Sequence, residues 1–110
     1  MINGVVAKHL MATYLQKTNV AAEKNANWFV YIVECADQSL YTGIARDTDK
    51  RIAKHNEGTG AKYTRSRLPV TLIYREPQAN RSAALKREAL IKRLTRTQKI
   101  ELIEAYTQLP

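Results

Sequence analysis

The chain has 110 residues, a length that fits one domain, and 45% of them are hydrophobic, which excludes an intrinsically disordered protein. The single cysteine, Cys35, excludes an internal disulfide and a cysteine-based zinc finger. No apolar run reaches the ~18 residues of a membrane span, and the N-terminus lacks the apolar segment of a secretory signal. We therefore expect a soluble, cytoplasmic protein without membrane contacts, in which Cys35 is a core residue.

The net charge of +8 is unevenly distributed along the chain. From Lys62 to Lys99 there are eleven Lys or Arg residues and two acids, Glu76 and Glu88. The rest of the chain has seven basic and eight acidic residues. A concentrated basic segment attracts polyanions. We therefore predict a nucleic acid as partner, with DNA as the first choice and RNA left open.

Residues 1–27 differ from the rest of the chain. A few apolar residues interrupted by Lys8 and His9 are followed by a mostly polar stretch over 16–27. This pattern predicts an N-terminal extension that is weakly helical or disordered, with a helix that packs on the domain or on a partner as the alternative. The folded domain is expected over 28–106.

The domain begins with two predicted strands that form a hairpin. Residues 28–35 are rich in aromatic and β-branched side chains, and residues 40–44 form a second short run of this kind. The four residues between them, three of which are polar, are too few for anything but an antiparallel connection. Gly43 closes the second strand, where a residue without Cβ permits a close approach of the backbone.

Helices dominate the remainder, with one more strand. We predict a helix over 47–58, a basic loop over 62–69, a strand over 70–75, a helix from Asn80 or Ser82 to about 94, and a helix over 96–106. The order ββαβαα has no regular βαβ repeat. It predicts a small α+β domain in which helices pack on a mostly antiparallel sheet.

Four residues near the hairpin are candidates for phosphate chemistry. Tyr31 and Tyr41 lie on the two strands, and Arg51 and His55 share one face of the following helix because they are four residues apart. A tyrosine, with pKa ~10, becomes useful as a base or proton relay only beside a cation or a metal-bound water. Arg51 would bind a phosphate oxygen, and His55 would bind the phosphate or carry a proton. The alternatives are core tyrosines and a solvated helix with an Asp47–Arg51 pair.

Glu88 is the candidate metal ligand. It lies at the edge of the apolar stripe of its helix, and carboxylates are ligands of hard cations such as Mg²⁺. The alternative is an ordinary ion pair with Lys92. Arg87 lies inside the same stripe, and we expect its stem to cover the edge of the core while its charged end stays in water.

A basic stretch before the third strand is the candidate nucleic-acid contact. It contains Lys62, Tyr63, Arg65 and Arg67. Basic side chains would contact phosphates, and Tyr63 would stack on a base. The alternative is a solvated loop.

Together these residues resemble the GIY-YIG nuclease superfamily, in particular its small stand-alone bacterial members. The first motif corresponds to Phe29-Val30-Tyr31 and the second to Tyr41-Thr42-Gly43. Arg51 falls at the helix arginine of the family, with His55 one turn later, and Glu88 at the metal-binding glutamate. The run Gly60-Ala61-Lys62-Tyr63-Thr64 and the stretch from Arg81 to Lys92 also look like those stand-alone members. The resemblance covers roughly residues 28–105.

The resemblance implies a three-stranded antiparallel sheet between helices and a metal-dependent endonuclease that hydrolyses DNA phosphodiesters. It implies one divalent cation, Mg²⁺ or Mn²⁺, and no small-molecule cofactor. Tyr31 or Tyr41 would act as base, Arg51 would stabilise the phosphorane-like charge, and Glu88 would hold the metal. We expect structured or damaged DNA as substrate, as in DNA repair. Ile44 stands where some members have a lysine, which predicts slow or conditional cleavage. A non-catalytic nucleic-acid-binding module with the same fold is the alternative.

Overall fold

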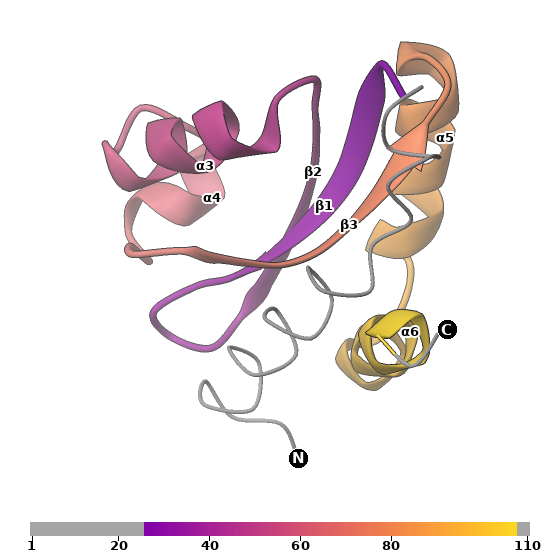
Figure 1. Ribbon diagram of the computed structural model, residues 1–110. Coiled ribbons are helices and arrows are strands. Elements are labelled where there is room, and N and C mark those ends of the chain that lie inside the picture. The colour runs from indigo at the N-terminus through magenta and orange to yellow at the C-terminus, as the bar shows by residue number, and fades with distance from the viewer. Residues whose placement is uncertain (1–25, 108–110) are drawn as a thin grey trace.

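A three-stranded antiparallel sheet lies between two layers of helices in the computed structural model (Figure 1). The structure describes residues 26–107, so the predicted extension over 1–27 lies outside the described residues except for its last two. The elements are β1 (Trp28–Glu34), β2 (Leu40–Ala45), α3 (Thr48–Asn56), α4 (Lys62–Arg65), β3 (Thr71–Gln78), α5 (Arg81–Lys92) and α6 (Arg96–Thr107). This architecture confirms the predicted α+β class. None of the helices in the described range has the length and apolar character needed to cross a membrane.

The central strand of the sheet is β1, because the strand order is β2-β1-β3. In this register Tyr31 is opposite Gly43 on β2 and Arg75 on β3. The pairing with β3 shifts by one residue, since Ile32 is opposite Tyr74 while Val33 is opposite Leu72. Tyr31 is therefore held by strands on both sides, and only its side chain is free to take part in a site.

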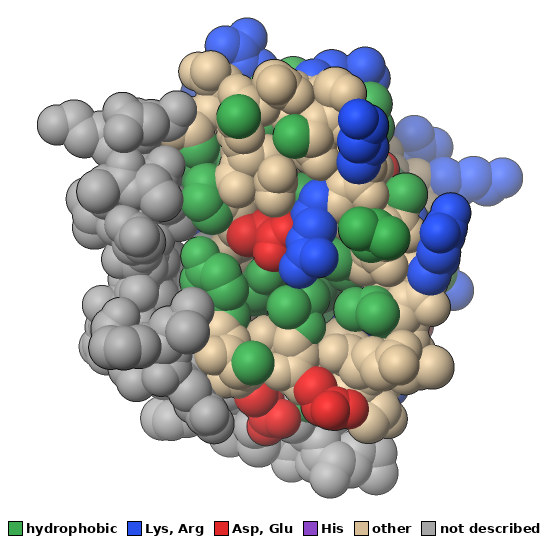
Figure 2. Space-filling model, turned by 90° about the vertical axis from the view of Figure 1, so that its right-hand side faces the viewer, with side chains coloured by type: hydrophobic (Ala, Val, Ile, Leu, Met, Phe, Trp, Pro, Cys, Tyr) green, Lys and Arg blue, Asp and Glu red, His purple; other side chains and the backbone are tan. Residues whose placement is uncertain are grey.

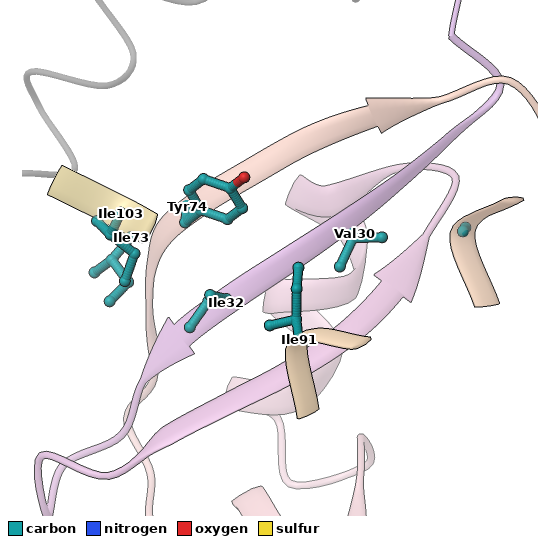
Figure 3. Packing of buried hydrophobic residues seen from close by; sticks show 7 residues of the cluster. Val30, Ile32, Ile73, Tyr74, Ile91 and Ile103 are labelled. Atoms are coloured by element: carbon teal, nitrogen blue, oxygen red, sulfur yellow. The ribbon is translucent and has the colours of Figure 1, made fainter. Parts of the chain in front are cut away.

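Each face of the sheet has its own core. On the side of α5 and α6 the buried side chains are Val30, Ile32, Ile73, Tyr74, Ala84, Ile91 and Ile103 (Figure 3). On the side of α3 and α4 they are Tyr31, Val33, Cys35, Ala45, Val70 and Leu72. The alternation of Val30 to Val33 along β1 thus supplies both cores. Cys35 is free and buried, which confirms it as a core residue.

One predicted loop and the end of one predicted strand differ from the structure. Residues 62–65 form the short helix α4 instead of a loop, because the backbone N–H of Thr64 donates to the carbonyl of Ala61 at 3.1 Å and Thr64 is fully buried. The third strand continues to Gln78, beyond the predicted end at 75, since Phe29 pairs with Pro77. A proline is tolerated there because β3 is an edge strand.

A buried carboxylate accounts for the position of Arg87. Glu76 on β3 is 8% exposed, and it accepts hydrogen bonds from the Tyr74 hydroxyl and from Nε of Arg87. A buried charge of this kind requires a partner. The predicted position of Arg87 at the edge of the core is consistent with the 36% exposure of its side chain, but the sequence did not indicate its ion pair with Glu76. On this side of the molecule acidic and basic side chains adjoin one another among hydrophobic ones (Figure 2).

Candidate active site

A buried hydrogen bond between Tyr31 and His55 joins the central strand to α3. The hydroxyl oxygen of Tyr31 lies 2.8 Å from Nε2 of His55. The exposed fraction is 1% for Tyr31 and zero for His55. The structure thus brings together two of the predicted site residues from different elements, in a contact that excludes water.

The contacts of Nδ1 guide the assignment of the proton on His55. Nδ1 lies 2.9 Å from Oγ1 of Thr64, and this hydroxyl can donate its single proton to the carbonyl of Ala61, also at 2.9 Å. In that arrangement Oγ1 accepts from Nδ1, whereas the N–H of Ala61, which donates to Nδ1 at 3.4 Å, favours the opposite tautomer. We assign the proton to Nδ1 because the contact with Thr64 is the shorter of the two. Nε2 is left as the acceptor of the Tyr31 proton.

Burial sets the protonation states of this pair. It lowers the pKa of His55, and the positive charge of Arg51 lowers that pKa further. Burial also raises the pKa of Tyr31 to about 12, against an opposing contribution from hydrogen bonding to Arg51. At neutral pH His55 is therefore neutral and Tyr31 is protonated, which is the state in which Tyr31 donates to Nε2.

Arg51 and Glu88 both act on the Tyr31 hydroxyl, although α3 and α5 cover opposite faces of the sheet (Figure 1). The charge of Arg51 lowers the pKa of Tyr31, and the charge of Glu88 raises it. Asp47, the alternative partner of Arg51, instead caps α3 by accepting from the backbone N–H of Lys50 at 3.1 Å. No carboxylate in the described part of the chain forms an ion pair with Arg51. Its guanidinium is thus available to an anion.

Two glycines leave the space that Tyr31 and His55 occupy. A Cβ at Gly43 would lie 2.5 Å from the hydroxyl oxygen of Tyr31, and a Cβ at Gly60 would lie 2.9 Å from Cα of His55. Such distances require something to shift. The close approach expected at Gly43 therefore involves the Tyr31 side chain, which crosses the edge strand at the one residue without a side chain.

Tyr41 forms the outer part of the site, where it is half-buried. Its ring lies edge-on to that of His55, with centroids 5.6 Å apart, and it stacks on Tyr63 at 5.9 Å. The guanidinium of Arg67 lies 3.9 Å from the Tyr63 ring centre, and its Nε donates to Asp37 at 3.1 Å. A row of contacts therefore runs from the hairpin turn through Arg67 and Tyr63 to Tyr41.

The four predicted nucleic-acid contacts fall into two groups. Tyr63 and Arg67 already have partners in the row described above, so Tyr63 stacks on Tyr41 where a base was expected. Lys62 and Arg65 are exposed on α4.

Glu88 is the only predicted metal ligand, and its surroundings fit the binding of a hydrated divalent cation through one carboxylate. Its side chain is 18% exposed, and Lys92 Nζ lies 3.5 Å from its Oε2. No group of three His, Cys, Asp or Glu side chains within residues 26–107 could hold a metal. A single carboxylate suits Mg²⁺ or Mn²⁺, because such ions keep several waters and bind through one or two carboxylates and the phosphates of the substrate. The ion pair with Lys92, which was the alternative to metal binding, is present.

Sequence reasoning missed two residues and one contact that shape the site. Thr64 orients His55, and Gly60 leaves room for its ring. Lys92, named above only as a partner of Glu88, also has its Nζ 5.8 Å from the centre of the Tyr41 ring. The run Gly60-Ala61-Lys62-Tyr63-Thr64 belonged to the family resemblance, and this was the only signal for the first two. Nothing in the sequence indicated that Lys92 approaches Tyr41.

Comparisons with known proteins show which family the chain is similar to. The GIY-YIG catalytic domain family matches residues 27–101. A UPF0213 protein of Staphylococcus epidermidis is 57% identical over 76 residues, which cover 69% of this chain and 93% of that protein. A UPF0213 protein of Staphylococcus aureus has the same identity and coverage. The solution NMR structure of a protein from E. faecalis is 39% identical, with a TM-score of 0.53, over 74% of this chain and 88% of that one.

The match includes every residue of the candidate site, from Tyr31 on the central strand to Glu88 on α5. It also spans all three strands of the sheet. The chain therefore belongs to the GIY-YIG nuclease superfamily, and its relatives there include UPF0213 proteins.

Proposed function

We propose that this protein is a divalent-metal-dependent endonuclease that hydrolyses phosphodiester bonds of structured or damaged DNA. The observation that supports the proposal most strongly is the hydrogen bond from Tyr31 to a neutral His55, next to an arginine without a carboxylate partner among the described residues. This combination provides a proton acceptor and a phosphate-binding group at one place. The cytoplasm stays the predicted location.

In the proposed reaction a water molecule attacks phosphorus and gives a proton to the hydroxyl oxygen of Tyr31. Because Tyr31 is 1% exposed in the substrate-free protein, the proposal requires that its hydroxyl becomes accessible to this water when DNA binds. The Tyr31 proton passes at the same time to Nε2 of His55, 2.8 Å away. The phosphorus–oxygen bond to the leaving strand breaks, and the leaving oxygen takes up a proton from solvent. Because the proton moves on to His55, Tyr31 need not exist as a free phenolate, whose formation its raised pKa opposes.

Arg51 and Glu88 supply the electrostatic part of the proposed site. The planar guanidinium of Arg51 binds two phosphate oxygens at once and stabilises the negative charge that develops on them. Glu88 would hold the divalent cation, which when bound neutralises charge on the phosphate and polarises it. Tyr41 lies beside His55 and limits the space around the reacting phosphate.

A non-catalytic nucleic-acid-binding module is the second candidate. The ion pair between Lys92 and Glu88 favours it, because an ammonium group already neutralises the carboxylate expected to bind the metal.

Cleavage assays separate the two candidates. Branched, nicked and intact duplex DNA are incubated with the protein and Mg²⁺ or Mn²⁺, with EDTA, and with the variants Glu88→Gln and Arg51→Ala. Glu101→Gln on α6, an exposed acid outside the site, is the matched control. The nuclease proposal expects cleavage that is lost with EDTA and in both site variants but not in the control. Cleavage that survives EDTA and Glu88→Gln contradicts it, and binding without cleavage of any substrate favours the module.

A further inference from the structure

A basic groove lies next to the candidate active site, between the end of β2 and α3. It has a volume of about 370 Å³ and is lined by Ile44, Ala45, Arg46, Asp47, Lys50, Arg51 and Lys54. Four of these residues are basic and one is acidic, although the groove lies entirely outside the Lys62–Lys99 segment that contains the excess charge of the sequence. The sequence therefore gave no reason to expect a concentration of positive charge at this place.

The positive charges of the groove are not neutralised by neighbouring side chains. Within residues 26–107 no carboxylate forms an ion pair with Arg46, Lys50 or Lys54, all of which are exposed. The one acid of the groove, Asp47, directs Oδ1 to the backbone N–H of Lys50 as the cap of α3. A polyanion that enters the groove therefore has no ion pair to break.

Three of the other basic residues of the domain already form ion pairs. Arg67 pairs with Asp37, Arg87 with Glu76, and Lys92 with Glu88. The face that includes α5 and α6 shows acidic side chains next to basic ones instead of a continuous basic surface (Figure 2). The α3 side is thus the better place for a polyanion, even though α5 and α6 carry more of the basic residues.

Arg51 connects the groove to the active site. It lines the groove, and it also acts on Tyr31 and His55. Lys50 and Lys54 are four residues apart on α3, so their backbones are separated by about 6 Å along the helix axis. They form a row of cations that starts beside Arg51 and is suited to successive phosphates of one strand.

We propose that this groove binds the sugar–phosphate backbone of DNA next to the phosphodiester that is cut. The inference rests on the proposed nuclease function, since it takes the phosphate at Arg51 as the one that reacts. Arg46, Lys50 and Lys54 then bind neighbouring phosphates without reading the base sequence.

Binding is tested without cleavage, so that the groove is judged separately from catalysis. Fluorescence anisotropy of fluorescein-labelled single-stranded and duplex oligonucleotides is measured in EDTA over a range of salt concentrations. The test variant is Lys50→Gln/Lys54→Gln. The matched control, Lys86→Gln/Arg93→Gln, removes two positive charges from exposed positions on or just after α5, outside the groove.

In the groove variant we expect weaker binding and a slope of log affinity against log salt that is smaller by about 1 for each lysine. The affinity and the slope of the control should change much less, because salt screens charges that lie far from the bound phosphates. A single Arg46→Gln variant, located before the helix, should reduce the slope by about 1 without any effect on helix stability. Comparable losses in the groove variant and in the control overturn the inference, as does an unchanged slope in both groove variants.

Mg²⁺-dependent cleavage by the unmodified protein distinguishes this failure from a failure of the proposed function. If the unmodified protein cleaves DNA and the groove variants bind DNA normally, only the proposed role of the groove is overturned. Groove-dependent binding without cleavage of any substrate would contradict the nuclease function and with it the reacting phosphate at Arg51.

Discussion

Lys92 and Glu88 lie on successive turns of α5, and the ammonium nitrogen of Lys92 is 3.5 Å from Oε2 of Glu88. The same nitrogen is 5.8 Å from the centre of the Tyr41 ring. Lys92 therefore supplies a positive charge to the carboxylate that we propose as metal ligand. A divalent cation at Glu88 must compete with it.

Removal of this competitor should strengthen metal binding. An ion pair between residues i and i+4 of a helix is worth about 0.3–0.5 kcal/mol, so Lys92→Gln should bind Mn²⁺ about twofold more tightly. Isothermal titration calorimetry with manganese chloride measures the affinity directly. Lys86→Gln on the same helix is the control for the loss of one charge. Equal or weaker binding by Lys92→Gln would show that the two cations do not compete.

The hydroxyl of Tyr31 can be removed while its ring is kept. Tyr31→Phe leaves Nε2 of His55 buried without its donor, which should lower the free energy of unfolding by about 1–3 kcal/mol. If Tyr31 takes the proton of water, kcat should fall by about 10²–10⁴-fold with little change in KM. Urea unfolding and single-substrate cleavage rates measure the two effects. Tyr41→Phe should retain more activity than Tyr31→Phe, and the reverse order would assign the base to Tyr41.

Acid should both inactivate and destabilise the protein through His55. The pKa of His55 is lowered in the folded state, so the unfolded chain binds its proton more readily. The contribution of neutral His55 to the free energy of unfolding is fully present above its pKa in the unfolded chain, about 6.5. This contribution is lost as the pH falls through the lower pKa of His55 in the folded protein. Protonated Nε2 also cannot accept the proton of Tyr31. The free energy of unfolding, measured with urea, and the cleavage rate should therefore both decline from neutral to acid pH. A rate that is constant down to the unfolding transition would exclude His55 as proton acceptor.

Gly43 should tolerate no side chain. The Cβ of Gly43→Ala would lie 2.5 Å from the Tyr31 hydroxyl oxygen, so the ring must move away from His55. We expect a loss of about 1–3 kcal/mol in stability and a large loss of activity. Gly58→Ala is the control, because Gly58 has φ of +84° but no atom nearer than 4.0 Å to an added Cβ. Gly58→Ala should lose stability through backbone strain, while the cleavage rate per folded molecule stays the same.

The order of elements was predictable because the continuous run of aromatic and β-branched residues in β1 and the Asp47 cap are local signals. The helix at Lys62–Arg65 was not, since it depends on burial of Thr64 against His55, a contact between residues nine positions apart. The end of β3 was missed because Glu76 and Pro77 look like a strand terminator, whereas Glu76 is buried with Arg87 as its partner.

The candidate site was predictable as a set of residues but not as an arrangement. Helical spacing placed Arg51 and His55 on one face, yet it could not show that His55 is fully buried and bonded to Tyr31. The basic groove at Arg46, Lys50 and Lys54 was missed because charge was counted along the chain, and acids in the same stretch cancel those cations in the sum. Only the fold shows that the acids do not pair with them.

The sheet separates the site into two parts with different supports. The Tyr31–His55 pair belongs to the core under α3, whereas Glu88 is carried by α5, which is anchored in the opposite core by Ala84 and Ile91. A substitution that changes the side-chain volume at Ile91 would therefore move the Glu88 carboxylate relative to Tyr31 and His55. The substituted residue would belong to the opposite core from Tyr31. If Glu88 holds the metal and Tyr31 passes its proton to His55, as we propose, a core substitution at Ile91 should alter metal affinity and the rate of proton transfer separately, without any change in a motif residue.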